Sequence, residues 1–159
     1  MTLYESQLSS PLKRLRLLAD DEGLRGIYFE EHNHLPVLVS TPAHDHPVLL
    51  EAKKQLEEYF AKERTEFDLP LSLKGTPFTL RVWDVLGQIP FGATSTYKTL
   101  AESLGVPKAS RAVGRAIAVN PVSIILPCHR VLGSSGKLTG YAGGLSNKEW
   151  LLKHEGLLG

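Results

Sequence analysis

The sequence predicts an α+β fold in which a small antiparallel sheet with one helix is followed by a mostly helical half. Before residue 30 apolar and polar residues alternate, and between residues 47 and 62 apolar residues recur at helical spacing. After residue 76 several short helical patterns follow one another, each with start or stop signals. A chain of 159 residues can form one good core or two small ones. We therefore expect a supporting domain over residues 1–75 and a second domain over residues 76–159.

The first strands are predicted from alternation and a turn. Leu15 and Leu17 alternate with arginines, and the apolar stretch 24–29 follows the turn-like residues 20–23. This pattern is typical of a β-hairpin. Residues 3–8 are the candidate for a third strand.

A helix is predicted to begin at Pro47, because proline suits the first helical position. It extends to about Lys62, and its apolar face consists of Ala52, Leu56, Tyr59 and Phe60. The mixed stretch 64–75 contains a proline and a glycine, and we interpret it as the linker between the two domains.

The second half begins with Thr76 as the cap of a helix that starts at a proline. After a loop over residues 90–96, short helices are predicted over residues 97–104 and 107–119, and Asn120-Pro121 ends the second one. Two short helices joined at a glycine, the second rich in basic residues, are typical of a helix-turn-helix.

A last helix is predicted from a capping box and a terminal glycine. Ser146 and Glu149 have the spacing of the box, and Gly156 follows the last turn. Trp150, with the two leucines after it, is the expected buried face.

Charge is distributed unevenly along a chain whose net charge is +1. Residues 103–148 carry six Lys or Arg residues and no Asp or Glu, which favours a polyanionic partner. The alternative is a solvated segment rich in glycine and alanine. No apolar stretch is long enough to span a membrane, and the first residues show no basic region followed by an apolar one, so we expect no secretory signal. A single cysteine indicates a reducing, cytoplasmic location.

Cys128 is the candidate nucleophile. The apolar residues 124–126 predict a buried strand, and Pro127 predicts a bend just before the thiol. Only the thiolate is nucleophilic, and the neighbouring His129 and Arg130 would favour it. Adjacent residues of an extended chain point to opposite sides, so a water would have to connect the thiol to the histidine. The alternative is that the cysteine is a small buried hydrophobe.

The helix over residues 107–119 is rich in small residues, among them Ala112, Gly114 and Ala116. A glycine inside a helix costs about 1 kcal/mol relative to alanine, so Gly114 implies close packing or close approach to a groove. Composition alone leaves both explanations open. Two His-x-His pairs (His32 with His34, His44 with His46) have no cysteine nearby, and no metal site is predicted from them.

Many spaced motifs resemble the O6-alkylguanine-DNA alkyltransferase family, also called methylated-DNA–protein-cysteine methyltransferases. They cover about residues 76–156 and include residues 111–114, 120–121, 124–131, 140–144, 148–152 and 154–156. The resemblance implies a ribonuclease-H-like first domain and a winged-helix-like helix-turn-helix in the second. It also implies DNA repair by irreversible, single-turnover transfer of an alkyl group from guanine O6 to Cys128, without a cofactor.

The resemblance implies roles for individual residues. Cys128 would be the acceptor, His129 the base that activates it through a water, and Glu155 the residue that orients the histidine. Asn120 would tie the turn before the acceptor to the helix-turn-helix. Tyr97 would lie near the guanine ring and supply a proton to the leaving base.

DNA and base contacts are implied in the same way. Arg111 would fill the space left by the extruded nucleotide, on a helix surface shared with Ala112, Gly114 and Arg115 and next to Lys108. The base pocket would be lined by the Val131 carbonyl, Tyr141 and the Ala142 amide.

The implied partner is double-stranded DNA with an alkylated guanine, bound in the minor groove, with no membrane and no obligate protein partner. Activity on O4-alkylthymine, the range of alkyl groups and cooperative self-association on DNA are left open. Some relatives hold zinc in the N-terminal half through cysteines, but Cys128 is the only cysteine of this chain, and some relatives have serine where Ala142 stands. A damage sensor that binds alkylated guanine without transfer is the main alternative, and a cysteine hydrolase is a third.

Overall fold

The computed structural model describes residues 2–32 and 38–158. The chain divides into two compact units, one ending at Leu73 and the other beginning at Lys74. Each unit is described by itself below.

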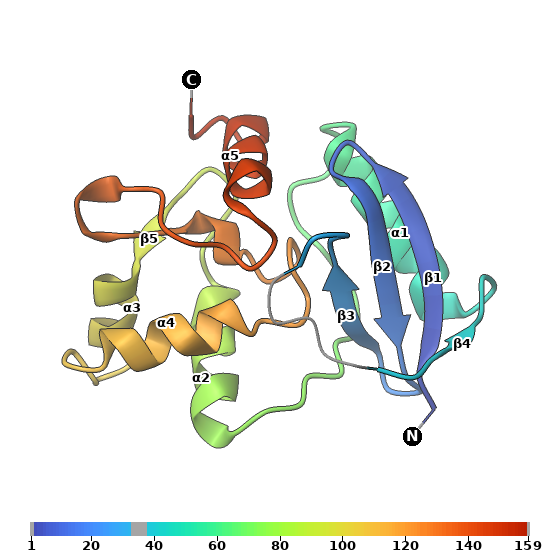
Figure 1. The fold of residues 1–159 in the computed structure, drawn as a ribbon, viewed down its shortest axis with the longest axis horizontal. Coiled ribbons are helices and arrows are strands. Elements are labelled where there is room, and N and C mark those ends of the chain that lie inside the picture. Colours follow the sequence, from blue (N-terminus) through green and yellow to red (C-terminus); the bar gives the residue numbers. More distant parts are fainter. Residues whose placement is uncertain (1, 33–37, 159) are drawn as a thin grey trace. The chain divides into compact units, whose positions relative to one another are not determined.

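The first unit is built on a four-stranded sheet in the order β3-β2-β1-β4 (Figure 1). Strands β1 (Tyr4–Ser10), β2 (Lys13–Ala19) and β3 (Leu24–Tyr28) are antiparallel, which confirms the predicted hairpin and third strand. Strand β4 (Thr41–Pro42) was not predicted, and it pairs with β1 in parallel. A strand of two residues, one of them a proline, is too short to show an alternation of apolar and polar residues.

Helix α1 (Pro47–Phe60) packs against one face of the sheet (Figure 1). It begins at Pro47 as predicted, and the His46 side chain accepts a hydrogen bond from the Val48 amide to cap it. The buried face contains Leu49, Ala52, Leu56 and Tyr59. This face and the sheet leucines form the core of the unit.

Residues 70–72, expected in a linker, are instead tied to the sheet. The Leu24 amide donates to the Pro70 carbonyl and the Ser72 amide donates to the Leu24 carbonyl, both at 2.8 Å. The Ser72 hydroxyl also donates to the buried Asp20 carboxylate at 2.7 Å. These backbone partners come from residues far apart in sequence, so local composition did not reveal them.

The second unit contains α2 (Pro77–Leu86), α3 (Tyr97–Ser103) and α4 (Ser110–Ala118), which pack on one another (Figure 1). Thr76 and Thr96 cap α2 and α3 through their hydroxyls. The indole of Trp83 on α2 donates to the Ala116 carbonyl of α4 at 2.8 Å, which joins the two helices inside the core.

Helix α4 begins three residues later than predicted. Pro107 and Lys108 lie in a turn, which the Ala109 amide closes by donating to the Val106 carbonyl at 2.8 Å. The expected start at Pro107 is therefore wrong, because that proline occupies the turn between α3 and α4. Lys108 stands just before the helix and not on it.

Helix α5 (Leu145–His154) ends as predicted but starts differently. Gly156 has a φ of 80°, the left-handed conformation that glycine adopts after a last turn. The N-cap is Gly144, with no side-chain cap, so the predicted capping box at Ser146 is wrong. Glu149 pairs instead with Lys153 one turn later. Trp150 is half-buried, and the buried positions are Lys148, Leu151 and Leu152.

The segment before the cysteine is buried but is not a strand. Ile124 has a φ of 76°, which reverses the chain within residues 123–126. A 3₁₀ turn, η1 (Cys128–Arg130), then leads into β6 (Val131–Leu132), which pairs in parallel with β5 (Ser95–Thr96). The prediction of a strand failed because a run of apolar residues indicates burial and not conformation.

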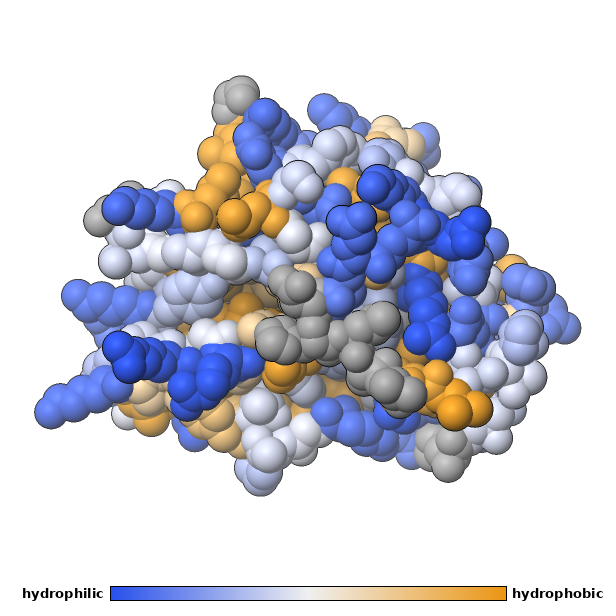
Figure 2. Space-filling model, in the orientation of Figure 1, coloured by the Kyte–Doolittle hydropathy of each residue, from blue (hydrophilic) through white to orange (hydrophobic). Residues whose placement is uncertain are grey.

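Among the described residues no helix is long and apolar enough to cross a membrane. Figure 2 shows mainly hydrophilic side chains over the face that it presents, with apolar ones near the C-terminal end of the chain.

Candidate active site

Cys128 lies at the start of η1 with only 6% of its surface exposed. Burial raises the pKa of its thiol, because a thiolate loses solvation inside the protein. The polar side chains of Asn120 and Tyr141 and the positive charge of Lys148 act in the opposite direction on this pKa. Burial outweighs these effects, so the pKa of Cys128 is raised overall and the thiol needs a base to ionise it.

His129 follows the cysteine and is completely buried. Its Nε2 donates to Oε2 of Glu155 over 2.7 Å, since a carboxylate can only accept. This leaves Nδ1 as the basic nitrogen, and Nδ1 has no hydrogen-bond partner among the described residues. Burial lowers the pKa of His129 against the opposing effect of Glu155, so the ring is held neutral and able to accept a proton.

Arg130 was not predicted as a site residue. Its Nε donates to Oε1 of Glu155 at 2.7 Å and its Nη2 donates to Oε2 at 3.0 Å. Its Nη1 donates to the Ile89 carbonyl at 2.7 Å. The guanidinium therefore holds the end of α5 against η1 and the loop after α2. No spacing in the sequence joins residues 130 and 155.

Asn120 closes the turn that precedes the cysteine. Its Nδ2 donates to the Leu126 carbonyl and its Oδ1 accepts from the Val122 amide, both at 2.9 Å. Asn120 follows the end of α4 directly. One side chain therefore connects the second helix of the helix-turn-helix to the segment that carries Cys128.

Lys148 is a second residue that sequence reasoning missed. Its side chain is completely buried, and its Nζ donates to the Val131 carbonyl at 2.7 Å and to the Thr139 carbonyl at 3.4 Å. Burial lowers its pKa to about 8, with the charge of Cys128 acting in the opposite direction. A signal was present, because positions 148, 151, 152 and 155 have the spacing of one helix face.

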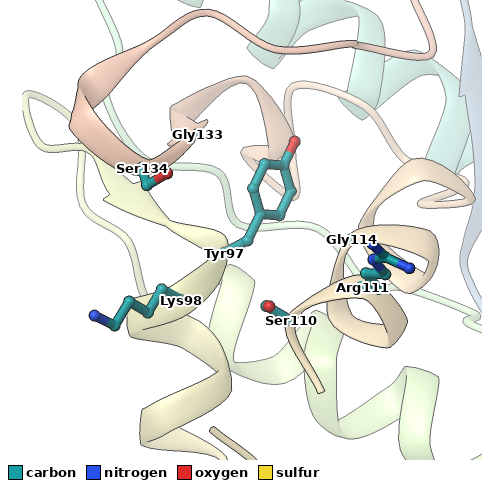
Figure 3. A pocket seen from close by; sticks show the side chains of 7 residues that line it. All are labelled: Tyr97, Lys98, Ser110, Arg111, Gly114, Gly133 and Ser134. Atoms are coloured by element: carbon teal, nitrogen blue, oxygen red, sulfur yellow. The ribbon is translucent and has the colours of Figure 1, made fainter. Parts of the chain in front are cut away.

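A pocket of about 390 Å³ opens between α3, α4 and the start of η2 (Ser134–Gly136) (Figure 3). It is lined by Tyr97, Lys98, Ser110, Arg111, Gly114, Gly133 and Ser134. In Figure 3, Lys98 and Arg111 extend from opposite sides of the pocket mouth and the Tyr97 ring lies between them. The Tyr97 hydroxyl accepts a hydrogen bond from Thr139 at 3.2 Å.

Gly114 explains part of the small-residue pattern of α4. A Cβ placed there would lie 3.6 Å from the Tyr97 ring, an ordinary contact that alanine could make. Packing inside the unit therefore does not require glycine at this position. The missing side chain instead keeps the pocket open beside Tyr97.

The structure brings Tyr97, Arg111 and Gly114 together but not all the predicted base contacts. Val131 and Tyr141 are buried and Ala142 is half-buried, and none of the three lines this pocket. Cys128 does not line it either. The Val131 carbonyl, expected to face a base, already accepts from Lys148, although a carbonyl has a second lone pair to offer.

Only some of the basic residues between positions 103 and 148 are exposed at the surface. Four of its six basic residues are exposed, namely Lys108, Arg111, Arg115 and Lys137, whereas Arg130 and Lys148 are buried. Arg111 and Arg115 are one turn apart on α4, with Lys108 just before them and Ala112 half-buried between them. Two exposed cations one turn apart therefore lie on α4, and a third lies just before its first turn.

The described residues contain no group of three side chains that could hold a metal ion. His34 lies outside the described residues. His46 caps α1, and His32 stacks on Phe29.

Comparison with known families matches both units. The model of the 6-O-methylguanine DNA methyltransferase DNA-binding domain matches residues 77–157, and that of the ribonuclease-like domain of the same family matches residues 3–73.

Individual relatives are similar in sequence to this chain over nearly its whole length. A methylated-DNA–protein-cysteine methyltransferase of Methanosarcina acetivorans is 46% identical, covering 97% of this chain and 99% of its own. One from Shigella flexneri is 42% identical, covering 99% and 98%. The crystal structure of Mycobacterium tuberculosis OGT in complex with DNA has a TM-score of 0.90 and 44% identity, covering 96% of this chain and 93% of that one.

Proposed function

The chain belongs to the 6-O-methylguanine DNA methyltransferase family, and from this we propose that it repairs DNA by moving an alkyl group from guanine O6 to Cys128. Transfer to a cysteine requires a thiol, and Cys128 is the only one in the chain. The observation that carries the assignment is the buried Cys128–His129–Glu155 arrangement, with 2.7 Å between histidine and carboxylate.

The reaction is a displacement at carbon. The Cys128 sulfur forms a bond to the alkyl carbon, the bond from that carbon to O6 breaks, and its electron pair stays with guanine. Guanine then takes up a proton, which Tyr97 supplies in this proposal. The product is a stable thioether, so each molecule acts once.

His129 accepts the thiol proton through a bridging water. Its Nδ1 is the acceptor nitrogen, because Nε2 is occupied by Glu155. The absence of a protein partner for Nδ1 among the described residues supports this role, since that nitrogen is available to a water. Glu155 orients the ring and fixes its tautomer.

DNA binding is proposed to use the minor groove and the exposed face of α4. Ala112 and Gly114 keep that face thin, while Lys108 and Arg115 contact phosphates. Arg111 occupies the gap left by the extruded nucleotide, a step that costs a few kcal/mol of unstacking. Val131, Tyr141 and Ala142 are proposed to contact the extruded base. A cytoplasmic location with access to chromosomal DNA is part of the same proposal.

Intact-mass and peptide-mass analysis after mixing with a duplex that contains O6-methylguanine tests the proposal. We expect one added methyl group on the peptide that contains Cys128, saturating at one per protein. The variant Cys128→Ala should bind the duplex and gain no mass. An unmodified wild-type protein that still binds the duplex tightly would contradict transfer and favour a damage sensor.

A further inference from the structure

Lys148 is a buried ammonium group whose two hydrogen-bond acceptors are uncharged. Its Nζ donates to the carbonyls of Val131 and Thr139, and it forms no salt bridge with a carboxylate in the part of the chain that the structure describes. Burying an ammonium without an anion is costly, because its hydration is lost and nothing of opposite charge replaces it.

Glu155, the buried carboxylate of the proposed active site, already forms an ion pair with another cation, Arg130. Both oxygens of Glu155 accept from Arg130, and Oε2 also accepts from His129. The histidine is held neutral by burial. Of the buried ionisable groups of η1, α5 and its C-cap, Lys148 therefore carries the positive charge that Glu155 does not balance.

Lys148 is also bound to the segment that carries the thiol. The carbonyl that accepts its shorter hydrogen bond belongs to Val131, three residues after Cys128. The remaining polar neighbours of the thiol, Asn120 and Tyr141, are uncharged in the neutral pH range. The thiolate is then the anion that can balance the lysine.

We propose that Lys148 is the counter-ion of the Cys128 thiolate, an inference that rests on Cys128 as the alkyl acceptor. When the thiol proton moves to His129, the resulting imidazolium shares the Glu155 carboxylate with Arg130, while the Lys148 ammonium keeps its own protons and stabilises the negative sulfur. When sulfur displaces the alkyl group from O6, the negative charge leaves with guanine, and Lys148 again has no anion beside it. Lys148 therefore takes no part in bond making or proton transfer. It is a positioning residue whose charge acts on the Cys128 sulfur.

The pH dependence of a DNA-free reaction tests this role. Iodoacetamide alkylates thiolates, since sulfur bonds to carbon and iodide leaves, so the midpoint of its rate against pH reports the ionisation of Cys128. We expect Lys148→Met to raise that midpoint by about one unit or more, the usual effect of an opposite charge nearby. Lys137→Met, which removes an exposed lysine of the loop after β6, should leave it unchanged.

Lys148→Gln separates charge from hydrogen bonding. The amide can still donate to both carbonyls but carries no charge, so the counter-ion role predicts the same raised midpoint as for methionine. A wild-type midpoint in Lys148→Gln, or in Lys148→Met, would overturn the proposal and leave Lys148 a purely structural role.

If the Lys148 variants fail to fold, a measurement on the wild-type protein still tests the proposal. Lysine side-chain NMR should show that the pKa of Lys148 falls once Cys128 carries a carboxamidomethyl group, because the counter-ion is gone. An unchanged pKa would overturn the proposal. The proposed function is tested by a different result. If it is wrong, no methyl group is transferred from DNA, whatever the midpoint of the iodoacetamide rate against pH.

Discussion

Arg130 donates to both carboxylate oxygens of Glu155, at 2.7 and 3.0 Å, although the two residues are 25 positions apart in the sequence. The same carboxylate accepts from His129, so one buried anion holds both residues that follow the acceptor cysteine. The position of the proposed base therefore depends on the last turn of α5.

Glu155→Gln should destabilise the protein strongly and slow alkyl transfer. The substitution leaves Arg130 buried without its anion, and breaking a buried pair in this way costs about 3–5 kcal/mol. Urea unfolding measures the loss, and the rate of methyl transfer measures the effect on His129. Glu149→Gln is the matched control, because its pair with Lys153 is exposed and contributes about 0.3–0.5 kcal/mol. Equal losses in the two variants would contradict the role of the buried pair.

Asn120→Ala should lower both stability and transfer rate. It leaves the buried Val122 amide unsatisfied, which costs about 1–3 kcal/mol, and it removes one of the two hydrogen bonds to the Leu126 carbonyl, which keeps the one from the Cys128 amide. It also removes a polar side chain that lowers the pKa of the Cys128 thiol. Chemical denaturation and single-turnover kinetics measure the two effects. A variant with wild-type stability would show that the turn closes without this side chain.

Arg111→Ala should slow repair of duplex DNA more than repair of a single strand. The side chain is needed to occupy a gap only where a base leaves a paired stack. The ratio of transfer rates on the two substrates is the measurement. Arg115→Ala is the control, since loss of a phosphate contact weakens binding to both substrates alike. If Arg111→Ala slows both reactions equally, it has no role in extrusion.

The methylated protein should melt at a lower temperature than the free protein. The acceptor lies in a packed site, and adding volume to such a site typically costs about 1–3 kcal/mol. Thermal unfolding of protein separated from DNA after complete methylation measures the difference. Cys128→Ala treated with the same duplex should keep its own melting temperature. An unchanged or higher value for methylated wild-type protein would count against this prediction.

Asp20→Asn should destabilise the protein near neutral pH and much less in acid. Burial alone would raise the pKa of Asp20, but hydrogen bonds from Ser72, Arg25 and two backbone amides outweigh it, so the folded-state pKa is lowered below 3.8. The stability from this lowered pKa is present above about pH 4 and is lost as pH falls through the folded pKa.

Urea unfolding of wild type and variant at neutral pH and at about pH 2 measures this difference. Asp21→Asn, at the exposed neighbouring position, should change little at either pH. A difference for Asp20→Asn that does not shrink in acid would show that its charge is not what stabilises the fold.

Elements with a local chemical signal could be predicted from the sequence. The threonine caps before α2 and α3, Pro47 at the start of α1 and Gly156 after α5 each act within one turn of the residue that carries the signal. The start of α5 could not be predicted, because a serine one residue inside the helix mimics a cap. Strand β4 is specified by its pairing with β1, which no local pattern records.

The site was predictable where the motifs were specific. The family motifs pointed to Cys128, His129 and Glu155 together. Arg130 and Lys148 were missed because a charged residue is solvated by default, and only the fold shows that both are buried. Lys148 could have been found from its shared helix face with two leucines, whereas Arg130 carries no such signal.

The single, buried thiol of this chain also determines how the protein is oxidised during storage in air. With one thiol among 159 residues, an internal disulfide cannot form, and a disulfide between two molecules would require the sulfurs of two cysteine residues, each only 6% exposed, to meet. Small oxidants such as hydrogen peroxide are not restricted in this way and can add oxygen to the sulfur. Storage damage should then be detected as added oxygen mass on the active-site peptide and not as a dimer band on a non-reducing gel.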